Sequence, residues 1–182
     1  MINNKEINII VAIGNNNEIG YKNNLLWRIS DDLKRFKNLT TSNNIIMGRK
    51  TYESLPKGAL PNRKNIVITH NTELNYENCI MANSLEKAIE KADLDKEIFI
   101  IGGEHVYKDA YKSCDYIYLT KVYEKFKADA FFPLINFSEW DVIETEKIEK
   151  SEKNEFTHEF FKLKRKQSWF TNLTPNVIQN YR

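Results

Sequence analysis

A carboxylate on an apolar helix face is the first feature of this sequence that could do chemistry. Residues 25–36 read Leu-Leu-Trp-Arg-Ile-Ser-Asp-Asp-Leu-Lys-Arg-Phe. Ser30 is a suitable N-cap, because its hydroxyl can accept a hydrogen bond from a free amide of the first turn. Residues three and four apart are neighbours on a helix, so Asp32 shares its face with apolar side chains, those of Ile29, Leu33 and Phe36.

Asp32 has two interpretations. Together with Asp31 it could serve only the start of the helix, where the helix dipole favours negative charge. Alternatively, Asp32 is a carboxylate in an apolar pocket, which is costly unless another group pairs with it. A flat ring with two parallel N–H donors would form such a pair. The helix residues alone do not decide between the two.

A strand-to-helix turn with two cations and a hydroxyl is the second candidate. It consists of Gly48, Arg49, Lys50 and Thr51. Free amides at a helix N-terminus, together with Arg and Lys, make an anion site, although the spacing is not that of a Walker motif. A solvated basic turn is the alternative. Arg49 and His70 each follow a predicted parallel strand, so they could converge on one phosphate.

Further candidates follow other predicted strands. The two glycines at 102–103 would let a flat or phosphorylated ligand approach the backbone, but they also suit a tight turn and lack the third glycine of a dinucleotide fingerprint. Arg63 could form a fork with a substrate carboxylate, although a surface arginine is the simpler interpretation. Tyr107 and Thr120 lie near the same predicted sheet edge, and each alone suits a structural role.

Composition sets limits on the class of protein. The chain has 182 residues and a net charge of +2, which suits one domain with a sizeable core. Lysines alternate with glutamates instead of forming a basic block, which argues against nucleic-acid binding. The isolated cysteines and the spacing of the histidines predict no metal or disulfide site. No apolar run approaches the roughly 20 residues of a membrane span, and no signal sequence is visible, so we expect a cytosolic protein with no membrane partner.

The elements that must position these residues alternate between strand and helix over the first two thirds of the chain. Apolar runs predict strands at 7–13, 44–47, 66–69, 79–81, 97–101 and 116–122. Helical stretches are expected at about 30–39, 51–55, 84–92 and 104–112. Residues 140–148 and 156–163 flank a charged turn and predict an antiparallel hairpin. Residues 14–24, with five asparagines and two glycines, predict a turn-rich loop that could act as a lid.

The predicted fold class is α/β. We expect a single domain with a central, mostly parallel eight-stranded sheet, an antiparallel C-terminal edge hairpin and about four flanking helices. Ligands bind such sheets at the carboxyl ends of the strands, where the candidate residues lie. The domain is expected to span residues 1–165. Residues 166–182 would form an extension that covers the sheet edge or mediates oligomers of an otherwise monomeric protein.

Together, these motifs resemble dihydrofolate reductases of the bacterial or phage type over about residues 9–164. The matching parts are Ile19-Gly20, Trp27, Asp32, residues 46–54, residues 61–65, residues 100–103 with Val106-Tyr107, and residues 131–133. Each part is short, but so many in the same order are specific. The resemblance therefore favours the pocket interpretation of Asp32.

The resemblance implies an enzyme that reduces 7,8-dihydrofolate to tetrahydrofolate with NADPH, supports one-carbon and thymidylate metabolism, and binds antifolates. Asp32 would hold the pterin ring N–H and 2-amino group, and Thr120 would hydrogen-bond both partners. The implied catalytic residues are Asp32, Trp27, Thr120 and Tyr107. The implied substrate pocket consists of Ile10, Val11, Ala12, Leu33, Phe36, Leu55, Leu60 and Ile101, with Arg63 as a clamp for the glutamate carboxylate.

The resemblance also implies a cofactor site. Arg49, Lys50, Thr51 and His70 would take the phosphates of NADPH, and residues 14–26 would close over the nicotinamide. The implied set is Ala12, Ile19, Gly20, Gly48, Arg49, Lys50, Thr51, Thr69, His70, Asn71, Ile101, Gly102, Gly103, Glu104, His105, Val106 and Tyr107. The chemistry belongs to the cofactor, so no metal is implied.

Three positions depart from the family pattern. Leu26 stands where proline is usual, which would loosen the lid, and Ala130 stands where threonine is common. His70 replaces a small hydroxyl residue near the expected 2′-phosphate. Two rival functions remain: a reductase of the same fold that acts on another heterocycle, as in the riboflavin pathway, and a non-catalytic pterin or nucleotide binder. The first would not need Asp32 together with Arg63, and the second would bind ligands without turnover.

Overall fold

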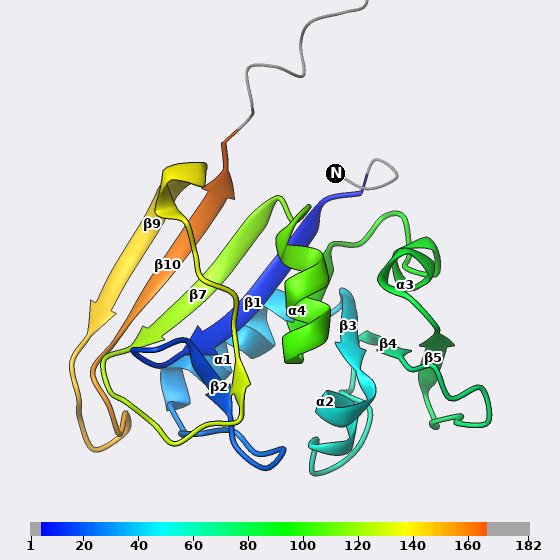
Figure 1. The fold of residues 1–182 in the computed structure, drawn as a ribbon, viewed down its shortest axis with the longest axis horizontal. Coiled ribbons are helices and arrows are strands. Elements are labelled where there is room, and N and C mark those ends of the chain that lie inside the picture. The colour runs from blue at the N-terminus through cyan, green and yellow to red at the C-terminus, as the bar shows by residue number, and fades with distance from the viewer. Residues whose placement is uncertain (1–4, 167–182) are drawn as a thin grey trace, which may run out of the picture.

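One eight-stranded sheet forms the centre of the molecule (Figure 1). The computed structural model describes residues 5–166, so almost all of the predicted C-terminal extension lies outside the described residues. The strand order is β5-β4-β3-β6-β1-β7-β10-β9. The strands are β1 (Ile7–Ile13), β3 (Asn44–Gly48), β4 (Lys64–Ile68), β5 (Cys79–Ala82), β6 (Ile98–Gly102), β7 (Tyr116–Val122), β9 (Trp140–Ile148) and β10 (His158–Arg165).

The direction of the strands confirms the predicted sheet. Every neighbouring pair from β5 to β7 is parallel. β10 is antiparallel to both β7 and β9, and β9 forms the edge. The C-terminal hairpin thus closes one side of the sheet, as the alternating pattern of residues 140–163 predicts.

Helices cover both faces of the sheet. Within residues 5–166 these are α1 (Ser30–Thr40), α2 (Arg49–Glu53), α3 (Leu85–Glu90), α4 (Glu104–Tyr111) and the 3-10 turn η1 (Phe137–Glu139). Figure 1 shows α4 in front of the sheet and α1 behind it. Aliphatic side chains of β1 and β3 are buried beneath both layers, which explains the nearly continuous apolar runs of the central strands. None of these helices is long and apolar enough to cross a membrane.

The predicted loop at residues 14–24 contains a strand that the sequence does not reveal. β2 (Glu18–Gly20) pairs antiparallel with β8 (Ala130–Phe131) to form a small separate ribbon. Beyond β2, Tyr21 and Asn24 are bridged by a two-residue turn. Both turn residues, Lys22 and Asn23, have positive φ values of 48° and 60°, as a tight hairpin turn requires.

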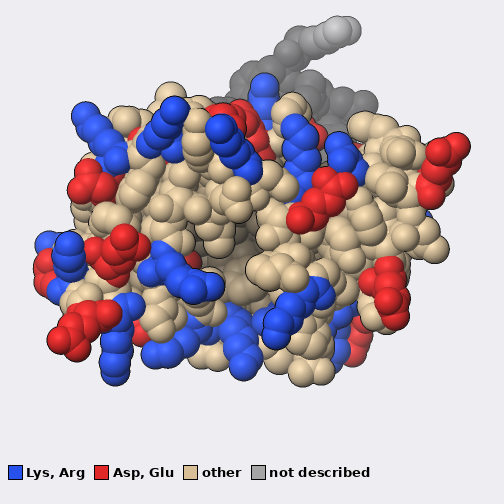
Figure 2. Space-filling view, turned by 90° about the horizontal axis from the view of Figure 1, so that it is seen from below, with Lys and Arg blue, Asp and Glu red and all other residues tan. Residues whose placement is uncertain are grey.

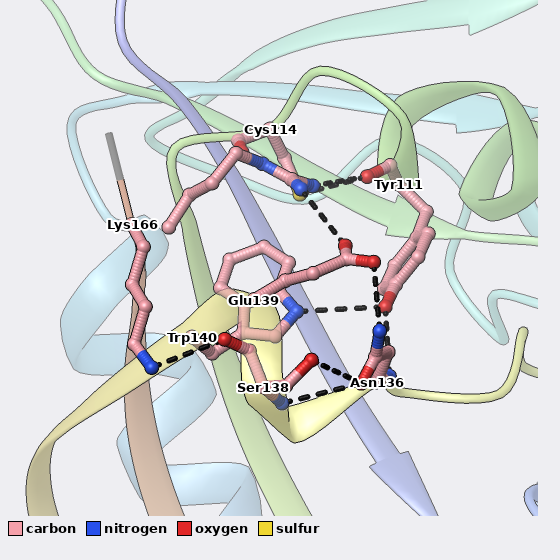
Figure 3. Close-up of polar contacts among 8 residues, drawn as sticks. Tyr111, Cys114, Asn136, Ser138, Glu139, Trp140 and Lys166 are labelled. Carbon is pink, nitrogen blue, oxygen red and sulfur yellow. Dashed lines mark hydrogen bonds and ion pairs between the residues drawn. The ribbon is translucent and has the colours of Figure 1, made fainter. Parts of the chain in front are cut away.

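The end of β10 is fixed by a polar network around Arg165. The guanidinium donates from Nε to the carbonyl oxygen of Cys114 at 2.8 Å and lies 4.2 Å from the centroid of the Trp140 ring. The backbone amide of Lys166 donates to the carbonyl oxygen of Glu139 at 2.9 Å. Figure 3 shows these neighbours converging beside η1. Because β10 is antiparallel to β7, this anchor lies at the end of the sheet away from the carboxyl ends of the parallel strands.

Candidate active site

The candidate residues gather at the edge of the sheet where β1 and β3 end. Seen from this side, the molecule is hollowed, and lysine and arginine side chains stand around the hollow (Figure 2). Parallel strands offer their carboxyl ends to a ligand at such an edge. A basic rim suits a ligand that carries phosphates or carboxylates.

Asp32 and Thr120 form a hydrogen-bonded pair between α1 and β7. Thr120 is 3% exposed, and its hydroxyl donates to Oδ1 of Asp32 at 2.6 Å. Burial raises the pKa of Asp32, while the bond from Thr120 and the positive charge of Arg35 act in the opposite direction. Asp32 is therefore a desolvated carboxylate held by a specific partner, which favours the pocket interpretation over a role at the helix start alone.

Ser30 does not cap α1, contrary to the prediction from sequence. Ile29 occupies the N-cap position and provides no side-chain hydrogen bond. Asn154, in the turn between β9 and β10, accepts a hydrogen bond from the backbone amide of Asp31 at 3.3 Å. A cap from so distant a residue produces no pattern in the sequence near the helix. The residues around the helix start therefore predicted Ser30 as the cap.

Apolar side chains on the α1 face of the sheet surround the space near Asp32. Members of the predicted pocket that pack there while remaining partly exposed are Ile10, Leu55, Leu60 and Ile101. Leu33 is 45% exposed, which suits a residue that lines an open pocket. Val11 differs from the prediction, because its side chain is buried in the cluster on the opposite face, with α3 and α4. Side chains alternate along a strand, so neighbouring Ile10 and Val11 cannot both face α1.

Arg63 is held against the C-terminal end of α1 and is not a free surface arginine. Its Nε donates to Oγ1 of Thr40 at 2.8 Å, and its terminal nitrogens donate to the carbonyl oxygens of Pro61 at 2.6 Å and Lys37 at 3.4 Å. Thr40 lies eight residues after Asp32, which is about 12 Å along a helix axis. A ligand that lies along α1 could therefore reach Asp32 with one end and Arg63 with the other.

The two glycines at the end of β6 form a cradle in which the first turn of α2 approaches the backbone closely. A Cβ atom on Gly102 or on Gly103 would lie 3.1 Å from Oγ1 of Thr51, and Gly102 has a φ of +134°. A Cβ on Gly48 would lie 3.3 Å from Val106. The starts of α2 and α4 thus meet at the glycine pair, whose linking peptide is cis. This close backbone surface fits the pyrophosphate and ribose of a dinucleotide.

The basic turn after β3 and the end of β4 lie side by side. Gly48 is paired in register with Ile68, so Arg49 and His70 leave neighbouring strands at the same edge. Arg49 forms an ion pair with Glu53 at 2.9 Å while its side chain remains 42% exposed. His70 is exposed as well. This placement is compatible with one phosphate between them.

Other predicted residues are distributed around the same edge. The Tyr107 side chain is 5% exposed and donates from its hydroxyl to the carbonyl oxygen of Ile10 at 2.9 Å. Ala12 of β1 is paired in register with Thr120 of β7. The remaining candidates are on β2, on α2, in the loop that follows β4 or in the first turn of α4: Ile19, Gly20, Lys50, Thr69, Asn71, Glu104 and His105. Within residues 5–166, no group of three or more His, Cys, Asp and Glu side chains is placed to hold a metal ion.

Glu18 ties the loop of residues 14–24 to the body of the protein, and the sequence analysis did not identify it. This carboxylate is 2% exposed and accepts hydrogen bonds from the amides of Asn16 at 2.6 Å and Phe126 at 3.2 Å. Burial acts to raise its pKa, but the hydrogen bonds outweigh burial and lower it. Trp27 packs against Phe126 with its ring tilted by 55° and 4.8 Å between the ring centroids. The available signal was a single carboxylate within an asparagine-rich loop.

Comparison with known proteins identifies the family. The family profile described as dihydrofolate reductase matches residues 6–165. The chain belongs to the dihydrofolate reductase family. Its curated relatives include the dihydrofolate reductase of Bacillus subtilis (strain 168), which is 38% identical over 162 residues, covering 89% of this chain and 96% of the relative. That of Staphylococcus haemolyticus is 38% identical over 155 residues, covering 85% and 93%.

A solved dihydrofolate reductase has the same fold. The Enterococcus faecalis enzyme, complexed with NADP(H) and RAB-propyl, superposes with a TM-score of 0.82 at 33% identity, covering 89% of this chain and 97% of that chain. These likenesses do not favour the two rival functions, a reductase of another heterocycle and a non-catalytic binder. Dihydrofolate reductase membership also agrees with the resemblance that the sequence motifs indicate.

Proposed function

We propose that this protein reduces 7,8-dihydrofolate to 5,6,7,8-tetrahydrofolate with NADPH. A hydride and its electron pair reach C6 of the pterin, a proton reaches N5, and NADP⁺ is the second product. The observation that carries the proposal is the Asp32–Thr120 pair on the apolar α1 face of a chain in this family. No nucleophile is needed, because NADPH, when bound, supplies the hydride.

Asp32 would recognise the pterin by its donor edge. Its carboxylate oxygens can accept from the ring N–H and the 2-amino group in a bidentate arrangement. The Thr120 hydroxyl donates to Asp32, so its oxygen is left to accept a hydrogen bond from the same amino group. One carboxylate that grips this edge cannot also reach N5, so a water molecule would deliver the proton while Asp32 favours the protonated pterin.

Arg63 would bind the opposite end of the substrate. Its planar guanidinium is oriented by Thr40, Pro61 and Lys37, and it can pair with a carboxylate through its remaining N–H groups. The distance of about 12 Å along α1 between Asp32 and Thr40 allows a benzoylglutamate to connect the two sites. Antifolates that present the same donor edge would compete at Asp32.

The cofactor would occupy the glycine cradle and the basic turn. Gly102, Gly103 and Thr51 offer the close backbone surface for the pyrophosphate, and Arg49 with His70 would hold the 2′-phosphate. The lid, residues 14–26, would exclude water from the stacked rings. We also infer a cytosolic location, since Cys79 and Cys114 are free thiols.

The test is the loss of NADPH absorbance by purified protein with and without dihydrofolate. We expect consumption that depends on dihydrofolate and stops with an antifolate diaminopyrimidine. Asp32→Asn should abolish most of this turnover while the melting temperature stays at or above that of the parent protein. Tight NADPH binding without dihydrofolate-dependent consumption would contradict the proposal.

A further inference from the structure

The turn between β9 and β10 reaches the helix that carries Asp32. Asn154 in this turn is 3% exposed. Its Oδ1 accepts from the backbone amide of Asp31 at 3.3 Å, and its Nδ2 donates to Oδ2 of Asp31 at 2.7 Å. Both polar atoms of this buried side chain therefore form hydrogen bonds with Asp31, the immediate neighbour of Asp32.

The turn holds Asn154 in place from its own side. The amide of Ser151 donates to the carbonyl oxygen of Asn154 at 2.9 Å, and the amide of Asn154 donates to Oγ of Ser151 at 3.3 Å. Asn154 also forms an isolated β-bridge with Ile29, which is 1% exposed. A side chain fixed by its turn and by this bridge can orient the helix it contacts.

The start of α1 depends on this contact. The first amides of a helix have no partner within the helix, and neither Ile29 nor Ser30 provides a side-chain cap. The bond from Nδ2 also holds the carboxylate of Asp31 toward the turn, so two adjacent carboxylates point in different directions. The bond between Thr120 and Asp32 at 2.6 Å requires that α1 keep this position relative to β7.

We propose that Asn154 is a positioning residue for Asp32. It supplies from the C-terminal hairpin the N-cap that α1 lacks locally, and it thereby sets where the Asp32 carboxylate meets a substrate. This inference rests on the role proposed for Asp32.

The test compares Asn154→Ala with a matched cap deletion elsewhere. Ser84 also caps a helix start through a side-chain oxygen, accepting from the amide of Lys87 in α3 at 3.2 Å, and α3 carries none of the site residues. Losing a cap lowers the equilibrium constant for forming the helix start several-fold. We therefore expect Asn154→Ala to lower kcat and diaminopyrimidine affinity by roughly three- to tenfold. NADPH affinity should stay the same. Ser84→Ala should leave kcat, diaminopyrimidine affinity and NADPH affinity unchanged. Both variants are measured at temperatures well below their melting temperatures.

A swapped pair provides the rescue. In Asp31→Asn/Asn154→Asp, the carboxylate introduced at position 154 can accept hydrogen bonds from the backbone amide and from the side-chain amide of residue 31. Both contacts between the two residues are thus restored. We expect this double variant to recover most of the kcat and the diaminopyrimidine affinity that Asn154→Ala loses.

Three results would overturn the proposal: unchanged values in Asn154→Ala, equal losses in Asn154→Ala and Ser84→Ala, or a swap that fails to restore kcat in a folded protein. Asp32→Asn separates this failure from failure of the proposed function. If Asp32→Asn itself leaves turnover and diaminopyrimidine affinity unchanged, the role of Asp32 is wrong. If it removes both while Asn154→Ala changes neither, only the role of Asn154 is wrong.

Discussion

The hydrogen bond between Thr120 and Asp32 can be removed with little change in side-chain shape. Thr120→Val replaces a hydroxyl by a methyl group at a position that is 3% exposed. The hydroxyl donates to Asp32 at 2.6 Å and so stabilises the ionised carboxylate, whose pKa burial already raises. Without the bond, burial acts with less opposition, and we expect the pKa of Asp32 to rise further.

The size of the rise follows from the strength of such a bond. A hydrogen bond to a charged group contributes about 1.5–3 kcal/mol, and one pKa unit corresponds to about 1.36 kcal/mol. The expected rise is therefore about one to two pKa units. Substrate binding should also weaken, because valine cannot accept a hydrogen bond from the pterin amino group.

The assay is an NMR titration of the Asp32 carboxyl carbon in the ligand-free protein. Thr145→Val is the matched control, since the Thr145 hydroxyl donates to Oε1 of Glu159 at 2.9 Å on the exposed edge strand β9, which β10 separates from the strand that carries Thr120. The control variant should leave the pKa of Asp32 unchanged. An unchanged Asp32 titration in a folded Thr120→Val variant would refute the reasoning.

Three further predictions concern other parts of the site. Arg63→Leu should raise the KM for dihydrofolate about tenfold, since a charged pair is lost, and spare the KM for NADPH; equal effects in steady-state kinetics would contradict the clamp. Arg49→Ala should reduce the preference for NADPH over NADH roughly tenfold, and an unchanged ratio of kcat/KM values would place the phosphate elsewhere. Asp32→Asn should stabilise the fold at neutral pH. The raised pKa of Asp32 means that the folded protein binds this proton more tightly, so the free energy of unfolding falls as pH rises from about 3.9 to the folded pKa. Urea unfolding at pH 4 and pH 7 should show a stability gain only at the higher pH.

Hydrophobic pattern was sufficient for the strands of the sheet. The predicted strands at 7–13, 116–122 and 140–148 have the bounds of β1, β7 and β9. The first two are central and covered on both faces, so their apolar runs are long and unambiguous. The helical stretch expected at 84–92 also begins as predicted, because Ser84 caps α3 and its hydrogen-bond partner Lys87 is local.

Features that depend on distant contacts could not be predicted in the same way. The cap of α1 comes from Asn154, and β2 and β8 are too short to produce a pattern of their own. The contact between Thr120 and Asp32 was expected only through family resemblance, since no spacing joins residues 88 positions apart. Val11 was assigned to the pocket although the alternation of a strand turns its side chain to the other face.

The cap of α1 determines when, during synthesis of the chain, this helix can be completed. Asn154 follows Asp31 by 123 residues, which a ribosome adds in about 6 to 25 s at the usual rates of synthesis. β10, which pairs with the strand that carries Thr120, is made even later. The helix that bears Asp32 is thus among the first elements to leave the ribosome and among the last to be completed. We expect a nascent chain to gain affinity for a diaminopyrimidine only after its final hairpin has emerged.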